Sequence, residues 1–138
     1  MSHNIIASIY EKKLIAWAKT LSVPLKVVVE NEAYKPVDGE TYLKAFTLPA
    51  DTASNTLGGD HKLYTGVFQV SIVTPSGKYR SAAGALADQI AVLFPLYERN
   101  TKEALTVVTM SPVDQGPGIP DDTTFTVPVS LLYRADTN

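Results

Sequence analysis

The chain of 138 residues is 45% apolar and 19% charged, values that are ordinary for one globular domain with a core large enough to need no metal or disulfide. It contains no cysteine, which excludes structural disulfides, thiolate zinc sites and cysteine nucleophiles. Its 12 basic and 14 acidic residues are scattered and give a net charge of -2, so autonomous binding to nucleic acid is not expected. We expect a single domain over residues 1–138.

Nothing in the sequence predicts contact with a membrane. No apolar run approaches the roughly 20 residues that cross a bilayer, and residues 1–4 lack the basic and apolar regions of a signal peptide. We therefore expect a protein that stays in the cytoplasm of the cell that makes it.

A first helix is predicted from Ile5 to Leu21, and Pro24 follows its end. Apolar residues recur there at helical spacing, namely Ile6, Tyr10, Leu14, Trp17 and Leu21. A second, weaker stripe consists of Ile5, Ile9 and Ala16. The helix therefore either has one broad core face, which we favour, or contacts two surfaces, such as its own sheet and a neighbouring subunit.

Strands are predicted over 25–29 and 41–48, with a turn over 31–40 between them, and the next strand covers 64–74. Both Leu43 and Phe46 are large and apolar, and a bulge near Lys44 would bury both. The stretch from Pro49 to Lys62 is polar and rich in glycine, and it predicts a long loop.

A slim second helix is predicted from Tyr79 to Phe94, since alanines and Gly84 occupy much of it. A strand over 105–110, an irregular loop over 111–122 and a final strand over 124–134 follow. Pro128 cannot donate to a sheet, so the final strand is expected at an edge or beside a bulge. We predict an α+β fold in which a mostly antiparallel sheet of about five strands carries both helices on one face, in the order α-β-β-β-α-β-β.

Candidate catalytic groups are few. Asp60 and His61 are adjacent in the long loop and could assist a serine nucleophile, but no Gly-x-Ser-x-Gly elbow is present, so we interpret them as solvated loop residues. Ser76-Gly77-Lys78 stands between a strand and a helix, yet the glycine that a phosphate-binding loop requires would fall at Ile72. We expect neither an enzyme nor a cofactor.

Carboxylates give no better case for chemistry. Asp121 and Asp122 lack spaced partners for a divalent cation. Four acidic residues flank the turn over 31–40 and are interpreted as a solvated hairpin edge, namely Glu30, Glu32, Asp38 and Glu40. Five tyrosines near element ends either cap the core or serve an interface, namely Tyr34, Tyr64, Tyr79, Tyr97 and Tyr133. We favour the capping role.

One resemblance covers nearly the whole chain. The segment YTGVFQVSIVTPSGK from Tyr64, the stretch AAGALADQIA from Ala82 and the Leu93-Phe94-Pro95 that follows resemble the central signature of phage tail terminator proteins. A leading helix and a closing PVSLLYR strand from Pro128 are also similar to that family. Its motifs are structural patterns and carry no catalytic residues to transfer.

The resemblance implies a virion subunit that assembles in the host cytoplasm and works in the tail or neck. Such subunits form a ring, commonly a hexamer, that caps the tail tube, stops its polymerisation and presents a surface to the head. The implied partners are other copies of the chain, the tail tube protein and head–tail connector proteins, with no nucleic acid, membrane or cofactor.

The two polar loops are the candidate partner interface, because long loops without internal structure are often completed by a partner. The candidate residues are Asp51, Ser54, Asn55, Gly58, Gly59, Asp60, His61, Gln115, Asp121 and Asp122. Three other functions stay open: a head–tail connector or neck protein, a monomeric adaptor, and a small hydrolase that uses Asp60 and His61.

Overall fold

The computed structural model describes residues 3–30, 32–50, 53–54, 62–77, 80–103 and 105–137. The predicted α+β class and the order of the main elements are confirmed, with more strands than the five expected. The helices are α1 (His3–Lys19) and α2 (Arg80–Leu93). The strands are β1 (Lys26–Val28), β2 (Tyr42–Pro49), β3 (Ala53–Ser54), β4 (Lys62–Pro75), β5 (Arg99–Lys102), β6 (Leu105–Thr109), β7 (Asp114–Gln115), β8 (Ile119–Pro120) and β9 (Thr124–Thr137).

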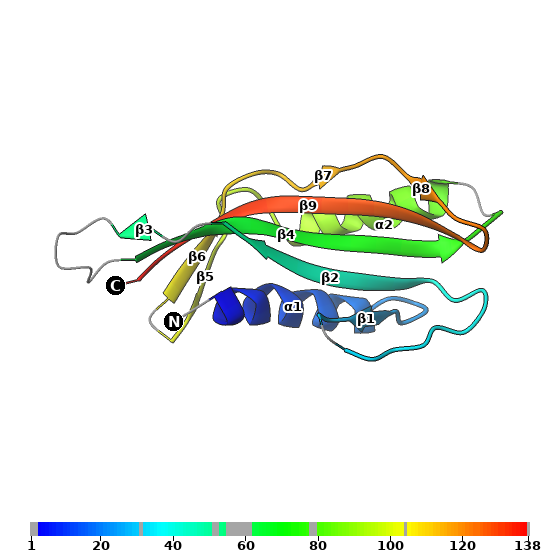
Figure 1. Ribbon diagram of the computed structural model, residues 1–138, viewed down its shortest axis with the longest axis horizontal. Coiled ribbons are helices and arrows are strands. Elements are labelled where there is room, and N and C mark those ends of the chain that lie inside the picture. The colour runs from blue at the N-terminus through cyan, green and yellow to red at the C-terminus, as the bar shows by residue number, and fades with distance from the viewer. Residues whose placement is uncertain are drawn as a thin grey trace.

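The centre of the sheet is a long antiparallel pair formed by β4 and β9, which run side by side along the long axis of the molecule (Figure 1). The main strand order is β1-β2-β4-β9-β6-β5, and β3, β7 and β8 pair outside this path. Only the β1–β2 pair among the described strands is parallel. The segment between these two strands is therefore a return connection rather than the hairpin turn that we expected.

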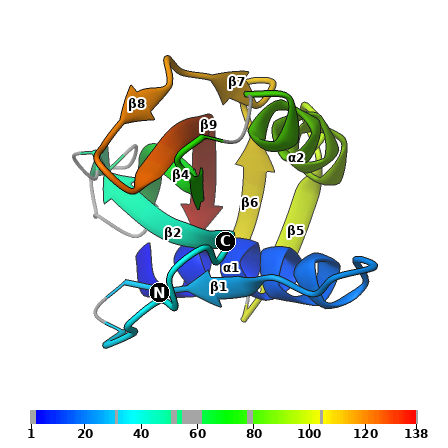
Figure 2. The same ribbon diagram turned by 90° about the vertical axis from the view of Figure 1, so that its right-hand side faces the viewer.

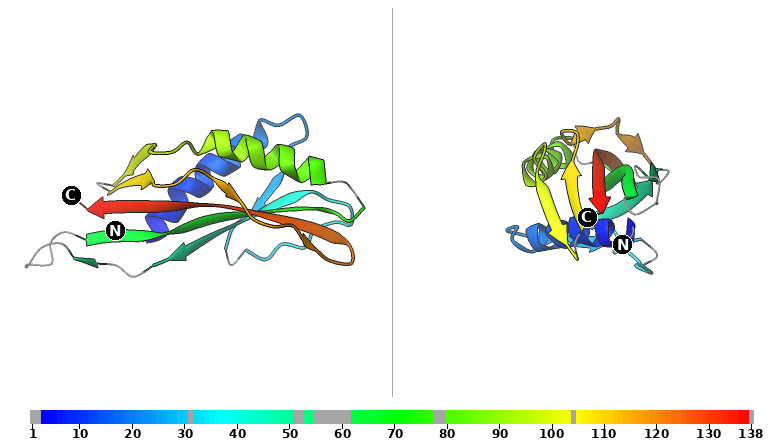
Figure 3. Two further views of the ribbon diagram at one scale, coloured as in Figure 1. Left: turned by 90° about the horizontal axis from the view of Figure 1, so that it is seen from above. Right: turned by 90° about the vertical axis from the view of Figure 1, so that its left-hand side faces the viewer.

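The sheet is curled around the first helix. Helix α1 contacts β1 and β2 at one end of the strand order and also β5 at the other end, while α2 contacts β4, β9 and α1. Views along and across the long axis show this curvature (Figures 2 and 3). Both helices therefore share the inner face of the sheet, as predicted.

An aromatic cluster lies at the centre of the core. The ring of Tyr10 stacks on Phe68 with a centroid distance of 5.1 Å, and Phe94 meets Tyr10 edge-on at 5.6 Å. The rest of the helical contribution follows the predicted periodicity: the other fully or nearly buried helix residues are Ile6, Leu14, Ala18, Ala83, Ala87 and Ile90. Burial of these side chains is the main favourable term that fixes the helices on the sheet.

The bulge predicted near Lys44 is wrong. Every residue of β2 from Tyr42 to Pro49 has one partner in β4, without an insertion. Leu43 faces the core and is fully buried, whereas Phe46 lies on the opposite face of the sheet and is half-buried. Each apolar residue finds cover on its own face, so no bulge is needed.

The edge position predicted for the final strand is also wrong, because β9 pairs with β4 on one side and with β6, β7 and β8 on the other. The Pro128 carbonyl accepts a hydrogen bond from the N–H of Gly116, at 2.8 Å. The nitrogen of Pro128 points to this same side, where β7 has ended and β8 has not begun. The missing N–H therefore falls at a local gap between two short partner strands.

Candidate interaction surfaces

The described residues contain no group of three or more side chains that could hold a metal ion. Asp60 and His61, the candidate hydrolytic pair, lie outside the described residues, as do Lys78 and Tyr79. Gly77, with φ of +89°, occupies a left-handed turn between β4 and α2, which is the plain strand-to-helix turn expected there. Asp121 and Asp122 are exposed turn residues, and the N–H of Asp121 donates to the carbonyl of Thr124 at 2.8 Å.

The acidic residues between β1 and β2 hold local structure. Glu32 accepts a hydrogen bond from the ammonium group of Lys26 at 2.6 Å and from the N–H of Val29 at 3.1 Å. These two hydrogen bonds lower the pKa of Glu32. Glu30 accepts from the N–H of Thr47 in β2. These contacts give the carboxylates a structural role.

Tyrosine capping of the core is confirmed for Tyr64 and Tyr133, which are buried. The Tyr133 hydroxyl lies 2.6 Å from Nδ1 of His3, whose ring also meets Tyr64 edge-on at 5.2 Å. Burial lowers the pKa of His3, which favours a neutral imidazole. Gly66 leaves room for this arrangement, because a Cβ atom there would collide with the Tyr133 hydroxyl and the carbonyl of Leu48. The start of α1 is thereby fixed to the sheet.

The interface residues predicted in the first polar loop mostly lie outside the described residues: Asp51, Asn55, Gly58, Gly59, Asp60 and His61. Ser54 belongs to β3 and pairs with Lys62. In the second loop, Gln115 in β7 is exposed and pairs with Val129. The second loop is thus partly ordered against β9 within the chain itself.

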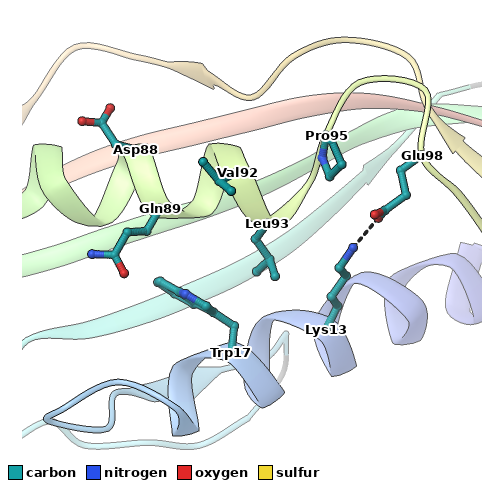
Figure 4. Close-up of a pocket in the computed structure, with 8 residues that line it drawn as sticks. All are labelled: Lys13, Trp17, Asp88, Gln89, Val92, Leu93, Pro95 and Glu98. Atoms are coloured by element: carbon teal, nitrogen blue, oxygen red, sulfur yellow. Dashed lines mark hydrogen bonds and ion pairs between the residues drawn. The ribbon is translucent and has the colours of Figure 1, made fainter.

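A groove between the two helices forms an apolar hollow with a volume of about 640 Å³. Its apolar lining comes from Trp17 on α1, Val92 and Leu93 on α2, and Pro95 just after α2 (Figure 4). Val92 is 81% exposed, although the other large apolar residues of its helix, Leu86, Ile90 and Leu93, are buried or half-buried. The groove therefore leaves apolar surface in water that the fold itself does not cover.

Polar groups stand at the two ends of this groove. At one end Lys13 of α1 forms an ion pair with Glu98, and its ammonium group lies 5.7 Å from the centroid of the Phe94 ring. At the other end Asp88 and Gln89 project from α2 (Figure 4). The groove thus combines an apolar floor with a few placed polar groups, a composition typical of binding sites.

The chain segment after α2 also exposes apolar side chains. Tyr97 has φ of 65°, an uncommon conformation for a bulky residue, and its side chain is 65% exposed. Its N–H donates to the carbonyl of Thr109 at 2.7 Å, which fixes the backbone. Strain of this kind persists where surrounding contacts hold it and is frequent at functional sites.

A second apolar surface lies on the outer face of the sheet. Leu48, Val67 and Leu132 are directly opposite one another in β2, β4 and β9, and the N–H of Met110 donates to the Leu132 carbonyl. Leu48 and Leu132 are each 51% exposed. This row is on the face turned away from the helices, so the molecule has exposed apolar surface on two different sides.

Sequence reasoning missed both surfaces. The groove joins residues that are about 70 to 85 positions apart in the chain, and only the packing of α1 against α2 and the segment after it brings them together. The weaker stripe of α1 was a partial signal for a second contact surface, yet Ile5 and Ile9 pack against the core and Ala16 is exposed. Trp17, which the helical spacing assigns to the core stripe, does pack against the core, and it also lines the groove.

The profile of a family described as "Phage tail terminator protein" matches residues 5–133. The chain belongs to the phage tail terminator family. One solved structure is 36% identical to it, with a TM-score of 0.83, and the alignment covers 98% of this chain and 96% of that one. No curated protein matches the chain. Membership of the family gives the chain a structural role in a phage tail.

Neither helix of the described part is both long and apolar enough to span a membrane.

Proposed function

We propose that this tail terminator assembles into a ring, hexameric as the family resemblance implies, that caps the end of the tail tube. The ring stops tube polymerisation and presents the surface to which the head is joined. The observation that carries the proposal is the family match over residues 5–133, and the two apolar surfaces on different sides of the molecule support it. A closed ring requires heterologous contacts between two different patches of each subunit.

The proposed partners are other copies of the chain, the tail tube protein and head–tail connector proteins, with assembly in the host cytoplasm and a final place in the virion. The predicted loop residues, including Ser54, Gln115, Asp121 and Asp122, remain candidates for the contact with the tube. A role without catalysis or cofactor is consistent with the family. Substitution of His61 by alanine tests the hydrolase alternative, because a hydrolase that relies on this imidazole would lose its hydrolytic activity.

The test is to measure the mass of the purified protein by light scattering over a concentration range, with and without assembled tail tubes. We expect a ring in solution, or a monomer that becomes a stoichiometric cap on tube ends. Electron microscopy of the tubes then shows the caps and measures tube length. A protein that does not bind tail tubes but binds a purified portal complex would instead be a head–tail connector.

Deletion of residues 54–59 tests whether the first polar loop contributes to the interface. We expect the variant to fold, because the aromatic cluster and the β4–β9 pair do not depend on these residues. We expect tail capping to be damaged. Normal tail maturation by this variant would remove the first polar loop from the proposed interface.

A further inference from the structure

Exposed apolar side chains form a continuous row across the outer face of the sheet. Leu48, Val67 and Leu132 lie opposite one another in β2, β4 and β9. Met110, the residue after β6, continues the row, because its N–H donates to the Leu132 carbonyl at 2.7 Å and its side chain is 42% exposed. We call these four residues the outer row. Neighbouring strands are about 4.8 Å apart, so the outer row is about 14 Å long and is a surface rather than a scatter of single residues.

The outer row borders a hollow with a volume of about 460 Å³. Val67 and Leu132 of the row line it together with Pro112 and Val113, which stand in the segment before β7. The outer face therefore offers a recess beside its exposed apolar side chains. A side chain from a partner could be covered there on more than one side.

Positive charge flanks the outer row on one side. Arg99 in β5 and Arg134 in β9 are both opposite Val108 of β6, two residues before Met110, and cross-strand partners share a face of the sheet. The Arg134 guanidinium forms an ion pair with Asp136 at 3.5 Å. Arg99 is exposed and has no ion pair within the described residues. It therefore places an uncompensated positive charge beside the row.

The groove between α1 and α2 has the opposite charge. Asp88 and Val92 are four residues apart in α2, so they project from the same face of the helix, and both are exposed (Figure 4). Lys13 and Glu98, which also line the groove, neutralise each other in an ion pair. Asp88 forms no ion pair with any residue that the structure describes. The groove thus combines apolar lining with one net negative charge.

The two surfaces cannot meet within one molecule. Both helices pack on the inner face of the sheet, whereas the outer row is on the opposite face. A second copy of the chain can bring its groove to the outer row of the first. Such a contact joins two different patches, so each copy keeps one of them free for its next neighbour, as a ring requires. A single repeated contact then covers both apolar surfaces.

We propose that the outer row of one copy is covered by the groove face of α2 from the neighbouring copy. This inference rests on the proposed ring and names the surfaces by which its subunits meet. Val92 packs against Leu132, and Asp88 pairs with Arg99. Asp114 of β7 is exposed on the other side of the row from the arginines, and it disfavours the reverse orientation because it would then oppose Asp88.

Disulfide trapping tests this contact directly, because the natural chain has no cysteine and two introduced thiols are the only ones present. We would make Val92→Cys and Leu132→Cys as single variants, mix them under assembly conditions on tail tubes, and oxidise the mixture. The expected product is a covalent dimer that forms only when both variants are present. Val92→Cys mixed with Ile119→Cys, which is 57% exposed on β8, is the control pair and should remain uncoupled.

Charge reversal gives an independent readout that does not depend on thiol geometry. Arg99→Glu and Asp88→Arg should each weaken ring formation or tube capping about tenfold, because each places like charges opposite one another. An equimolar mixture of these two variants should recover assembly, since every contact in an alternating ring again joins opposite charges. Lys35→Glu changes the net charge as Arg99→Glu does, at an exposed position away from both surfaces, and should assemble normally. All three variants should keep the thermal midpoint of the wild type.

The outcomes separate this inference from the proposed function. Rings or tube caps that form normally, but show neither the 92–132 cross-link nor recovery in the mixture of charge variants, would overturn the inference and leave the capping function standing. Protection of Leu132→Cys from a maleimide on tubes, without that cross-link, would also overturn it, because the tube protein would then cover the outer row. A wild-type chain that neither forms rings nor caps tubes would overturn the function and the inference together. The cross-link with recovery in the mixture supports both.

Discussion

The aromatic centre and the groove both lie where α1 meets the end of α2, yet the first is buried and the second is open to solvent. Tyr10 and Phe94 meet Phe68 in a cluster that is at most 1% exposed. Trp17, about two turns after Tyr10 in α1, and Val92, two residues before Phe94, line an open groove. The first region completes the fold, and the second retains apolar surface that the fold leaves exposed. Substitutions in the first should therefore cost stability, and substitutions in the second should cost assembly.

The largest loss of stability is expected from Tyr10→Ala. It removes a fully buried ring together with its stacking on Phe68 and its 3.0 Å hydrogen bond to Thr109. Large-to-small aromatic substitutions in cores cost about 3–5 kcal/mol in the free energy of unfolding. Urea denaturation followed by circular dichroism measures the loss. A loss below about 1 kcal/mol would show that the cluster is not the centre of the core.

The buried tyrosines Tyr10 and Tyr133 should make the free energy of unfolding fall at alkaline pH. Burial raises the pKa of both Tyr10 and Tyr133 to about 12, whereas an unfolded tyrosine titrates near 10. The contribution is fully present below pH 10 and is lost as pH rises from about 10 to about 12, because the unfolded chain releases protons that the folded protein retains. Denaturant midpoints measured at intervals from pH 9 to 11.5 should decline. Tyr10→Phe should flatten this decline, and an unchanged slope in that variant would assign the loss to other groups.

Two glycine-to-alanine substitutions compare a position where the backbone is crowded with one where it is open, and their effects on stability should have opposite signs. Gly66→Ala places a methyl group against the Tyr133 hydroxyl and the Leu48 carbonyl, and overpacking of this kind costs about 1–3 kcal/mol. Gly84→Ala lies in α2 with nothing within 4 Å and should stabilise by up to about 1 kcal/mol. Thermal unfolding of the two variants should shift in opposite directions. A neutral Gly66→Ala would show that Tyr133 can move away from β4.

Periodicity predicted the elements that bury a regular apolar stripe. Both helices were found this way, as were β1, β2, β4, β6 and β9, because alternation and helical spacing are local signals. Strand β5 was missed, since its sequence RNTK has no apolar alternation and its pairing with β6 is what makes it a strand. The two-residue strands β7 and β8 likewise exist only through β9.

The position of a residue relative to its tertiary partners was harder to predict from the sequence. Pro128 cannot donate a hydrogen bond to a neighbouring strand, and this rule was applied correctly. The gap between the short strands β7 and β8 satisfies it as well as a sheet edge would. The groove depends on which side of α1 meets α2, and no local pattern encodes this choice. The resemblance in residues 64–95 predicted the family correctly, because strand, turn and small-residue helix together form a longer pattern than any one element.

The Lys13–Glu98 ion pair stands between the two regions, since it touches Phe94 on one side and borders the groove on the other. Lys13→Met keeps most of the aliphatic contact and removes the charge. Pairs at this level of exposure contribute less than about 1 kcal/mol, so urea denaturation should detect only a small loss. A loss of several kcal/mol would mean that the pair is needed to hold α1 against β5, and the groove would then be part of the folding core.

The smallest effect on folding, and the clearest effect on assembly, is expected from Val92→Asp. Its side chain is 81% exposed, so the free energy of unfolding should stay within about 0.5 kcal/mol of the wild type. The charge would be buried without a partner if another subunit covered the groove, and assembly should then fail. The matched control is Ile119→Asp, which is also an exposed apolar residue but lies on β8, away from the groove. Equal stability with capping lost only in Val92→Asp would separate the two uses of α1 and α2, whereas capping retained in both variants would show that the groove stays open in the assembled tail.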